Sequence, residues 1–162
     1  MMKTISFFVV LFFAQNIHAD ACANLTGNWA GQCVKDNGTT SNGKLKLTQN
    51  GCASIDYGSG PLTIGTITDT KMSLSSYDKV HTNNYYAWNA TKTALERKFT
   101  LLALNSTNGN TFTEMATGTW TIENDQLKID QKWYVYVVTN GVSKETIVRS
   151  VCTYNREAGD DI

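Results

Sequence analysis

Histidine, the side chain most often used for acid–base chemistry and metal binding, is scarce in this sequence. There are two histidines, His18 near the start of the chain and His81. A serine-based triad would depend on His81 and Asp78, and their close spacing on a strand or loop does not by itself build a triad. No serine stands in a Gly-x-Ser-x-Gly elbow, and the spacings between the four cysteines match no metal-ligand pattern. We therefore predict a protein that is not an enzyme, with no metal site and no cofactor.

Two charged residues stand where an alternating strand would turn them inward. Glu114 shares the parity of Phe112 and Trp120, and Arg97 shares the parity of Phe99. A charge that faces an apolar interior must be paired, hydrated or used. Most other carboxylates sit at turns or on the polar side of their strands, so no acid pair of the glycosidase kind emerges. Either Arg97 and Glu114 both line a wet barrel mouth, where one of them would anchor a bound ligand, or the strand pattern slips at this point.

Aromatic side chains are the stronger sign of a binding function. Trp29, Trp120 and Trp133 fall on the inward parity of their strands, where they would form the walls of a ligand site with the two charged residues. If Trp133 faces inward, Tyr134 and Tyr136 face outward, where amphipathic rings suit an interaction surface. The alternative is that these tyrosines are present only because tyrosine favours strands.

Strands must position these residues, because alternation between apolar and polar side chains is the dominant pattern. Residues 44–48 alternate without a fault, and 111–123, 126–139 and 142–154 form three further segments of strand character. About 8 to 10 such strands joined by tight turns imply an antiparallel meander. We predict an all-β, disulfide-bonded domain that closes into a barrel, with a two-layered sandwich as the alternative.

The turns predict the strand register. Asn124-Asp125 and Asn140-Gly141 are strong hairpin turns, and a three-residue turn over Gln49-Asn50-Gly51 would set Leu47 opposite Ala53. Counting back from the two later turns predicts the pairs Trp120 with Ile129, Ala116 with Trp133, and Trp133 with Val148.

Two short stretches of the sequence carry a family resemblance. Leu25-Thr26-Gly27-Asn28-Trp29 resembles the first strand of the lipocalin-like and avidin-like barrels, the calycin type, in which the tryptophan of a Gly-x-Trp motif plugs one end. Gly118-Thr119-Trp120-Thr121-Ile122, with Leu127-Lys128-Ile129, is similar to a late hairpin of bacterial lipocalin-like domains. The resemblance implies a barrel with Arg149 or Arg156 over the first tryptophan. It implies no ligand, because the avidin ligand residues do not carry over.

The start of the chain predicts export. Lys3 precedes an apolar run, and the segment ends on Ala19, where a signal peptidase would cut. The run is too short to span a bilayer, and no other membrane span is predicted. We predict a secreted or periplasmic protein with a signal peptide over 1–19, a single β-barrel domain over 20–155 and a flexible tail over 156–162.

An exported chain with four cysteines favours two disulfide bonds. Strand parity favours the pairs Cys22–Cys52 and Cys33–Cys152. In a simple closed meander, however, Cys152 would arrive near the start of the first strand. Pairing of Cys152 with Cys22 or Cys52 is therefore a rival.

Two functions fit these features. The first is a carrier or sensor whose barrel holds a small, mostly apolar molecule, and the second is a protein-interaction module, such as a hydrolase inhibitor or a host-facing factor. Charge is balanced and only 17% of residues are charged, so no footprint for nucleic acid or an anionic membrane is present. An interior cavity would favour the carrier, and a filled core with an exposed aromatic face would favour the module.

Overall fold

The computed structural model describes residues 21–58, 60–69 and 73–158. Within these ranges all the regular secondary structure consists of β-strands. The predicted signal peptide lies outside the described residues. Strands form because an alternating sequence can bury one face and expose the other. They are β1 (Gly27–Lys35), β2 (Thr40–Asn50), β3 (Ser54–Asp56), β4 (Leu62–Thr63), β5 (Ile67–Asp69), β6 (Lys79–Trp88), β7 (Ala94–Leu104), β8 (Thr111–Glu123), β9 (Gln126–Thr139) and β10 (Val142–Arg156).

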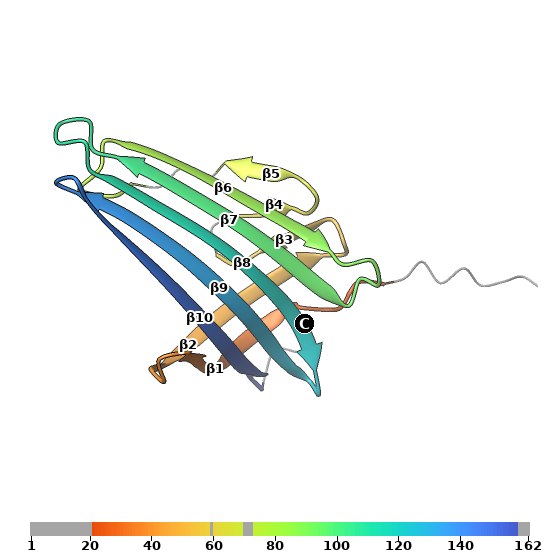
Figure 1. Ribbon diagram of the computed structural model, residues 1–162. Coiled ribbons are helices and arrows are strands. Elements are labelled where there is room, and N and C mark those ends of the chain that lie inside the picture. The colour runs from red at the N-terminus through yellow and green to blue at the C-terminus, as the bar shows by residue number, and fades with distance from the viewer. Residues whose placement is uncertain (1–20, 59, 70–72, 159–162) are drawn as a thin grey trace, which may run out of the picture.

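The strands form one antiparallel sheet in the order β4-β3-β2-β1-β10-β9-β8-β7-β6-β5. Each strand pairs with the next strand along the chain, except that β4 does not pair with β5. In addition, β1 pairs with β10, and the sheet curls strongly (Figure 1). The edge strands β4 and β5 are short, and the N–H of Gly65, which follows β4, donates to the carbonyl of Tyr86 in β6 at 2.6 Å. The sheet is therefore a nearly closed barrel, which confirms the predicted all-β meander in its barrel form.

The two long hairpins have the register that their turns predict. Asn124, Asp125, Asn140 and Gly141 all take positive φ, as a two-residue turn between right-twisted strands requires. The predicted pairs Trp120 with Ile129, Ala116 with Trp133, and Trp133 with Val148 are all present. A slip of one residue would move every side chain to the other face, so these turns decide which residues enter the barrel.

The predicted pairing of Leu47 with Ala53 is wrong. The structure pairs Gln49 with Ile55, which moves the turn two residues along the chain to the segment centred on Cys52. Cys52 is tied to the N-terminal segment by a disulfide bond, and the glycine before it takes the positive φ that opens the turn. Because the shift is even, Leu47 and Ile55 still face the core, and both are buried.

Disulfide bonds join Cys22 to Cys52 and Cys33 to Cys152, the pairing favoured by strand parity. Cys33 and Cys152 lie directly opposite each other in β1 and β10. The rival pairing expected Cys152 near the start of the first strand, but that place is taken by Arg156, which pairs with Trp29, and Cys152 lies opposite the later part of β1. Such a pair of bonds is typical of proteins that reside in an oxidising environment.

Trp29 lies in the larger of two apolar clusters, close to the start of β1. Its indole N–H donates to the Leu25 carbonyl at 3.0 Å, and the Arg156 guanidinium lies over its ring, 4.7 Å from the centroid. Arg156 therefore takes the place of the arginine that the resemblance implies, and it belongs to β10, one residue beyond the predicted domain boundary. Arg149 instead forms a two-pronged ion pair with Asp130.

Candidate functional site

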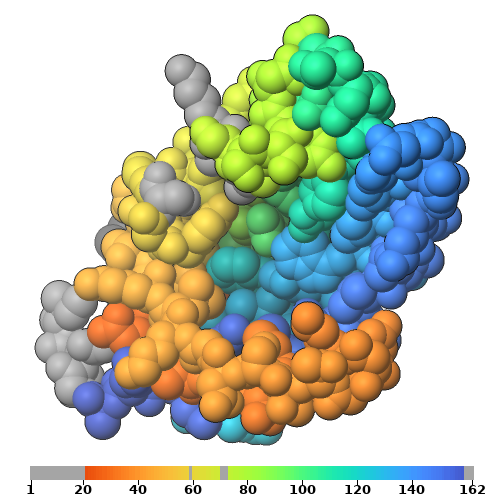
Figure 2. Space-filling view, turned by 90° about the vertical axis from the view of Figure 1, so that its left-hand side faces the viewer, coloured from red at the N-terminus to blue at the C-terminus, as the bar shows by residue number. Residues whose placement is uncertain are grey.

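The barrel contains two adjoining cavities, of about 590 Å³ and about 540 Å³. Both are lined by Tyr57, Arg97, Glu114 and Trp133, so the two spaces meet around these side chains. Figure 2 shows a hollow on one face of the molecule, with β2 (orange) below it and β9 and β10 (blue) to its right. Pockets of this size accommodate small molecules.

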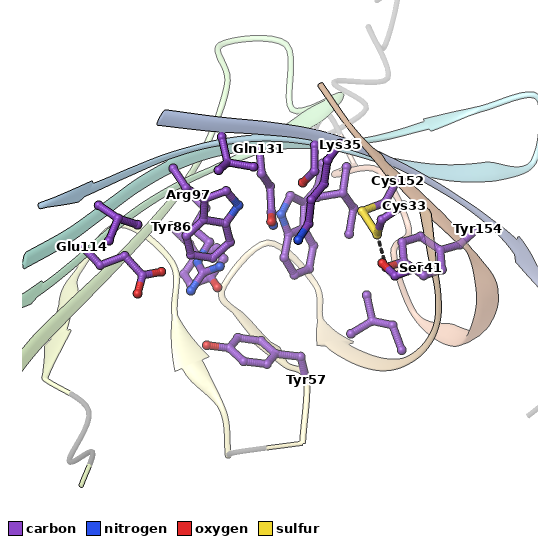
Figure 3. A pocket seen from close by; sticks show the side chains of 17 residues that line it. Cys33, Lys35, Ser41, Tyr57, Tyr86, Arg97, Glu114, Gln131, Cys152 and Tyr154 are labelled. Carbon is purple, nitrogen blue, oxygen red and sulfur yellow. Dashed lines mark hydrogen bonds between the residues drawn. A yellow bond between two sulfur atoms is a disulfide. The ribbon is translucent and has the colours of Figure 1, made fainter. Parts of the chain in front are cut away.

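One row of side chains around the inner wall is polar. Cross-strand pairing places Tyr86 of β6, Arg97 of β7, Gly118 of β8, Gln131 of β9 and Ser150 of β10 side by side. All except Gly118 line the larger cavity, and Figure 3 shows Tyr86, Arg97 and Gln131 along its wall. Gly118 leaves room for its neighbour, because a Cβ there would lie only 3.1 Å from the Gln131 Cγ. We call these five residues the polar row.

The rows on either side of the polar row are largely apolar. Their members in β7 to β10 are Leu95, Trp120, Ile129 and Cys152 on one side and Phe99, Ala116, Trp133 and Val148 on the other. The polar row therefore crosses a wall that is otherwise aromatic, aliphatic and sulfur-lined. An amphipathic molecule fits such a wall with its polar group at the row and its body on either side.

Arg97 is held in place by aromatic rings. Its Cζ lies 5.1 Å from the Phe99 ring centroid and 5.8 Å from those of Tyr86 and Trp133. One terminal nitrogen, Nη2, donates to the Asn84 side-chain oxygen at 3.3 Å. Arginine is attracted to aromatic faces and stays charged when partly buried. The guanidinium is thus fixed where the cavities meet, and the bond to Asn84 uses only one of its N–H donors.

Glu114 enters the same space from β8. Its carboxylate points into the cavity (Figure 3). Among the described residues it forms no ion pair within 4.0 Å. Burial raises the pKa of the Glu114 carboxyl above its ordinary value, and the positive charge of Arg97 offsets part of that rise. The cavity therefore contains a permanent cation beside an acid that ionises less readily than usual.

Three buried polar atoms lack a hydrogen-bond partner in the described part of the chain: Tyr86 Oη, Arg97 Nε and Trp120 Nε1. All three residues line the larger cavity. The guanidinium and indole groups can only donate, and burial raises the pKa of the Tyr86 phenol, so that it keeps its proton. Buried polar groups in native proteins are nearly always paired. These enclosed atoms lie in the wall of the larger cavity, and the Tyr86 hydroxyl has Tyr57 as its nearest polar neighbour there.

The structure brings together most of the predicted ligand residues. Arg97, Glu114, Trp120 and Trp133 all line the larger cavity. Trp29 does not, because it is packed beneath Arg156 and lines neither of these two cavities.

Sequence reasoning missed two tyrosines of the site. The Tyr57 ring lies 6.2 Å from that of Tyr86 and 6.4 Å from that of Trp120, measured between centroids. Tyr86 shares its strand parity with Trp88, so alternation along β6 contained a signal for it. Tyr57 follows the short strand β3, and no local pattern indicates that it turns into the barrel (Figure 3).

Tyr134 and Tyr136 lie on the outer surface, opposite in direction to Trp133. Met115, Tyr134 and Ile147 form one row across β8, β9 and β10. Met115 and Ile147 are both 49% exposed, and Tyr136 is 44% exposed. These four residues are called the outer apolar stripe below.

The other candidate chemistry does not assemble. His81 is exposed, with its Nε2 4.0 Å from the Asp69 carboxylate and 3.2 Å from the Asn83 amide. Asp78 accepts a hydrogen bond from the Ser106 N–H at 2.6 Å and does not pair with His81. Within residues 21–58, 60–69 and 73–158, no three His, Cys, Asp or Glu side chains group as metal ligands. No helix in the same ranges has the length and apolarity that a membrane crossing requires.

No protein-family model, curated protein or solved structure matches this chain. The nearly closed antiparallel barrel is compatible with a calycin-like fold.

Proposed function

We propose that this protein is a non-enzymatic binding protein of calycin type, secreted or periplasmic, that holds a small, mostly apolar molecule inside its barrel. The observation that supports this most strongly is the pair of joined cavities of about 590 Å³ and about 540 Å³, with aromatic walls. A filled barrel would have favoured a different role.

The unpartnered polar atoms add an energetic argument. A buried donor left without an acceptor costs about 1–3 kcal/mol. Tyr86, Arg97 and Trp120 each carry one such atom at the same cavity. These atoms are enclosed by the protein, so a ligand with acceptor atoms recovers part of that cost when the side chains turn to present them to it, which supports binding at this cavity.

A cavity-filling variant tests the proposal. Val135 lines the larger cavity, whereas its neighbour Tyr136 is 44% exposed on the outer face. We expect Val135→Trp to weaken binding of the neutral probe N-phenyl-1-naphthylamine by about tenfold or more, or ~1.4 kcal/mol, because the indole occupies the probe's space. Tyr136→Trp adds the same side chain outside and should leave the affinity unchanged. Fluorescence titration gives both values, with circular dichroism to verify the fold.

Equal affinities for the two variants would contradict interior binding. Native mass spectrometry of the mature protein after exposure to cell extract gives a second measurement. A retained small adduct supports the proposal, and a retained protein with no small adduct opposes it.

The outer apolar stripe favours a second candidate function. This is a protein-interaction module, such as a hydrolase inhibitor or a host-facing factor. Its half-exposed side chains lie in adjacent strands of one rigid sheet. Contiguous apolar surface of this kind is often an interaction site. In the same mass spectrometry experiment, a protein partner that is lost with Tyr136→Ser would support this second function.

A further inference from the structure

The charged and polar groups at the cavity are unbalanced in favour of donors and cations. Lys35 and Arg97 line the larger cavity and carry positive charge, and Glu114 is the acidic side chain among its lining residues. The unpartnered atoms of Tyr86, Arg97 and Trp120 are donors as well. The lining therefore has two cationic side chains for its one acidic side chain, which leaves positive charge in excess.

We propose that the ligand carries a single oxyanion, of the carboxylate or sulfonate type, on an aromatic or aliphatic body, and that Arg97 binds this oxyanion. The inference rests on the proposed function, since it names the chemical class of the molecule that the barrel holds.

The position of Arg97 suits this task. The rings of Tyr86, Phe99 and Trp133 hold its guanidinium within 5.1 to 5.8 Å of their centroids, so little side-chain freedom is left to lose on binding. The bond from Nη2 to Asn84 uses one donor. A guanidinium has five N–H donors in a planar fork that matches the geometry of an oxyanion.

The surroundings of Arg97 accommodate the rest of such a molecule. On one side of the polar row lie Trp120 and Ile129, and on the other lie Phe99 and Trp133. An apolar body on either side would bury its surface while its oxyanion stays at the row. Oxyanions paired with arginine form charge-assisted hydrogen bonds, which are about twice as strong as neutral ones.

Glu114 is the group that opposes an oxyanion here. It lies in β8, the strand next to that of Arg97, without a close ion pair, and its charge repels a second anion. Replacing it by glutamine removes that repulsion and keeps the shape. Glu114→Gln should therefore tighten the binding of an anionic ligand more than that of a neutral ligand.

The test uses two probes of the same shape, 8-anilinonaphthalene-1-sulfonate and N-phenyl-1-naphthylamine, of which only the first carries a sulfonate. A charge-assisted hydrogen bond contributes about 1.5–3 kcal/mol, so the wild-type protein should bind the sulfonate at least about tenfold more tightly than the neutral probe. Arg97→Met should abolish that preference. Lys98→Gln is the matched control, because it removes a neighbouring cation that is exposed and lines neither interior cavity, and it should preserve the preference.

The outcomes separate the two proposals. If the neutral probe binds in the cavity as tightly as the sulfonate, or if Arg97→Met keeps the preference, the oxyanion inference is wrong and the proposed function stands. If neither probe binds the wild-type protein in a saturable way, both fail. If Arg97→Met does not fold, two measurements still test the inference: the ratio of the two probe affinities in the wild-type protein, and the effect of Glu114→Gln. The inference is wrong if Glu114→Gln weakens sulfonate binding or leaves it unchanged.

Discussion

The Cys33–Cys152 bond should stabilise the fold more than the Cys22–Cys52 bond. The perturbation is a pair of double variants, Cys33→Ala/Cys152→Ala and Cys22→Ala/Cys52→Ala, each of which retains one disulfide. The first retains a bridge between residues 30 apart in the sequence, and the second retains a bridge between residues 119 apart. Comparing two chains with one bridge each avoids the complication that the two closed loops overlap.

The magnitude follows from the lengths of the retained loops. In the chain-entropy model a bridge destabilises the unfolded chain in proportion to the logarithm of loop length, so separations of 119 and 30 give a difference of about 1.2 kcal/mol. Packing acts in the same direction, because Cys152 is only 5% exposed and Cys33 packs against the larger apolar cluster. Cys22 and Cys52 are both less buried than Cys152. The Cys33→Ala/Cys152→Ala variant should therefore be less stable by at least about 1 kcal/mol.

Urea unfolding followed by far-ultraviolet circular dichroism measures the free energy of unfolding of both variants. The wild-type protein and a sample with both bonds reduced bracket the range. Equal stabilities, or a less stable Cys22→Ala/Cys52→Ala variant, would refute the reasoning. That result would mean that the bonds act through the folded state near β2 and β3 and not through the entropy of the unfolded chain.

Two further predictions concern single residues. Because burial raises the pKa of Glu114 in the folded state, the protein should lose stability as pH rises from the ordinary carboxyl pKa through the folded-state pKa. Glu114→Gln, which cannot ionise, should be more stable than the wild type in urea unfolding at pH 7 and nearly equal at pH 4; a difference that does not vary with pH would contradict this. Arg156→Ala removes the guanidinium over Trp29 and should lower the free energy of unfolding by about 0.5–1 kcal/mol, with Arg156→Lys losing less. An unchanged urea midpoint in Arg156→Ala would show that the stacking contributes nothing.

Much of the local architecture could be predicted from the sequence. Alternation along β8 and β9 indicated that Trp120 and Trp133 face inward, and the Asn124-Asp125 and Asn140-Gly141 turns set the register of both hairpins. The same parity placed Arg97 and Glu114 on the inner wall. These features are predictable because a period of two residues and the backbone of a tight turn depend only on nearby residues.

Part of the candidate site depended on contacts that no local pattern contains. Tyr57 enters the cavity from the loop after β3, and the turn before that strand lies two residues further along the chain than predicted. A three-residue strand offers too little alternation to fix either feature. The disulfide at Cys52 and the packing of Tyr57 against Tyr86 hold this segment.

By itself, the sequence determined the strands, their inward and outward faces, and the register of the hairpins with strong turns. Only the tertiary structure decided how far β1 pairs with β10, which puts Cys33 opposite Cys152. It also decided that Trp29 packs beneath Arg156, away from the cavity, and that space remains around Arg97. The physical reason is that closure depends on the summed twist, tilt and length of all the strands. Whether side chains fill the space inside is settled by that closure, since the same inward residues can surround a packed core or a cavity.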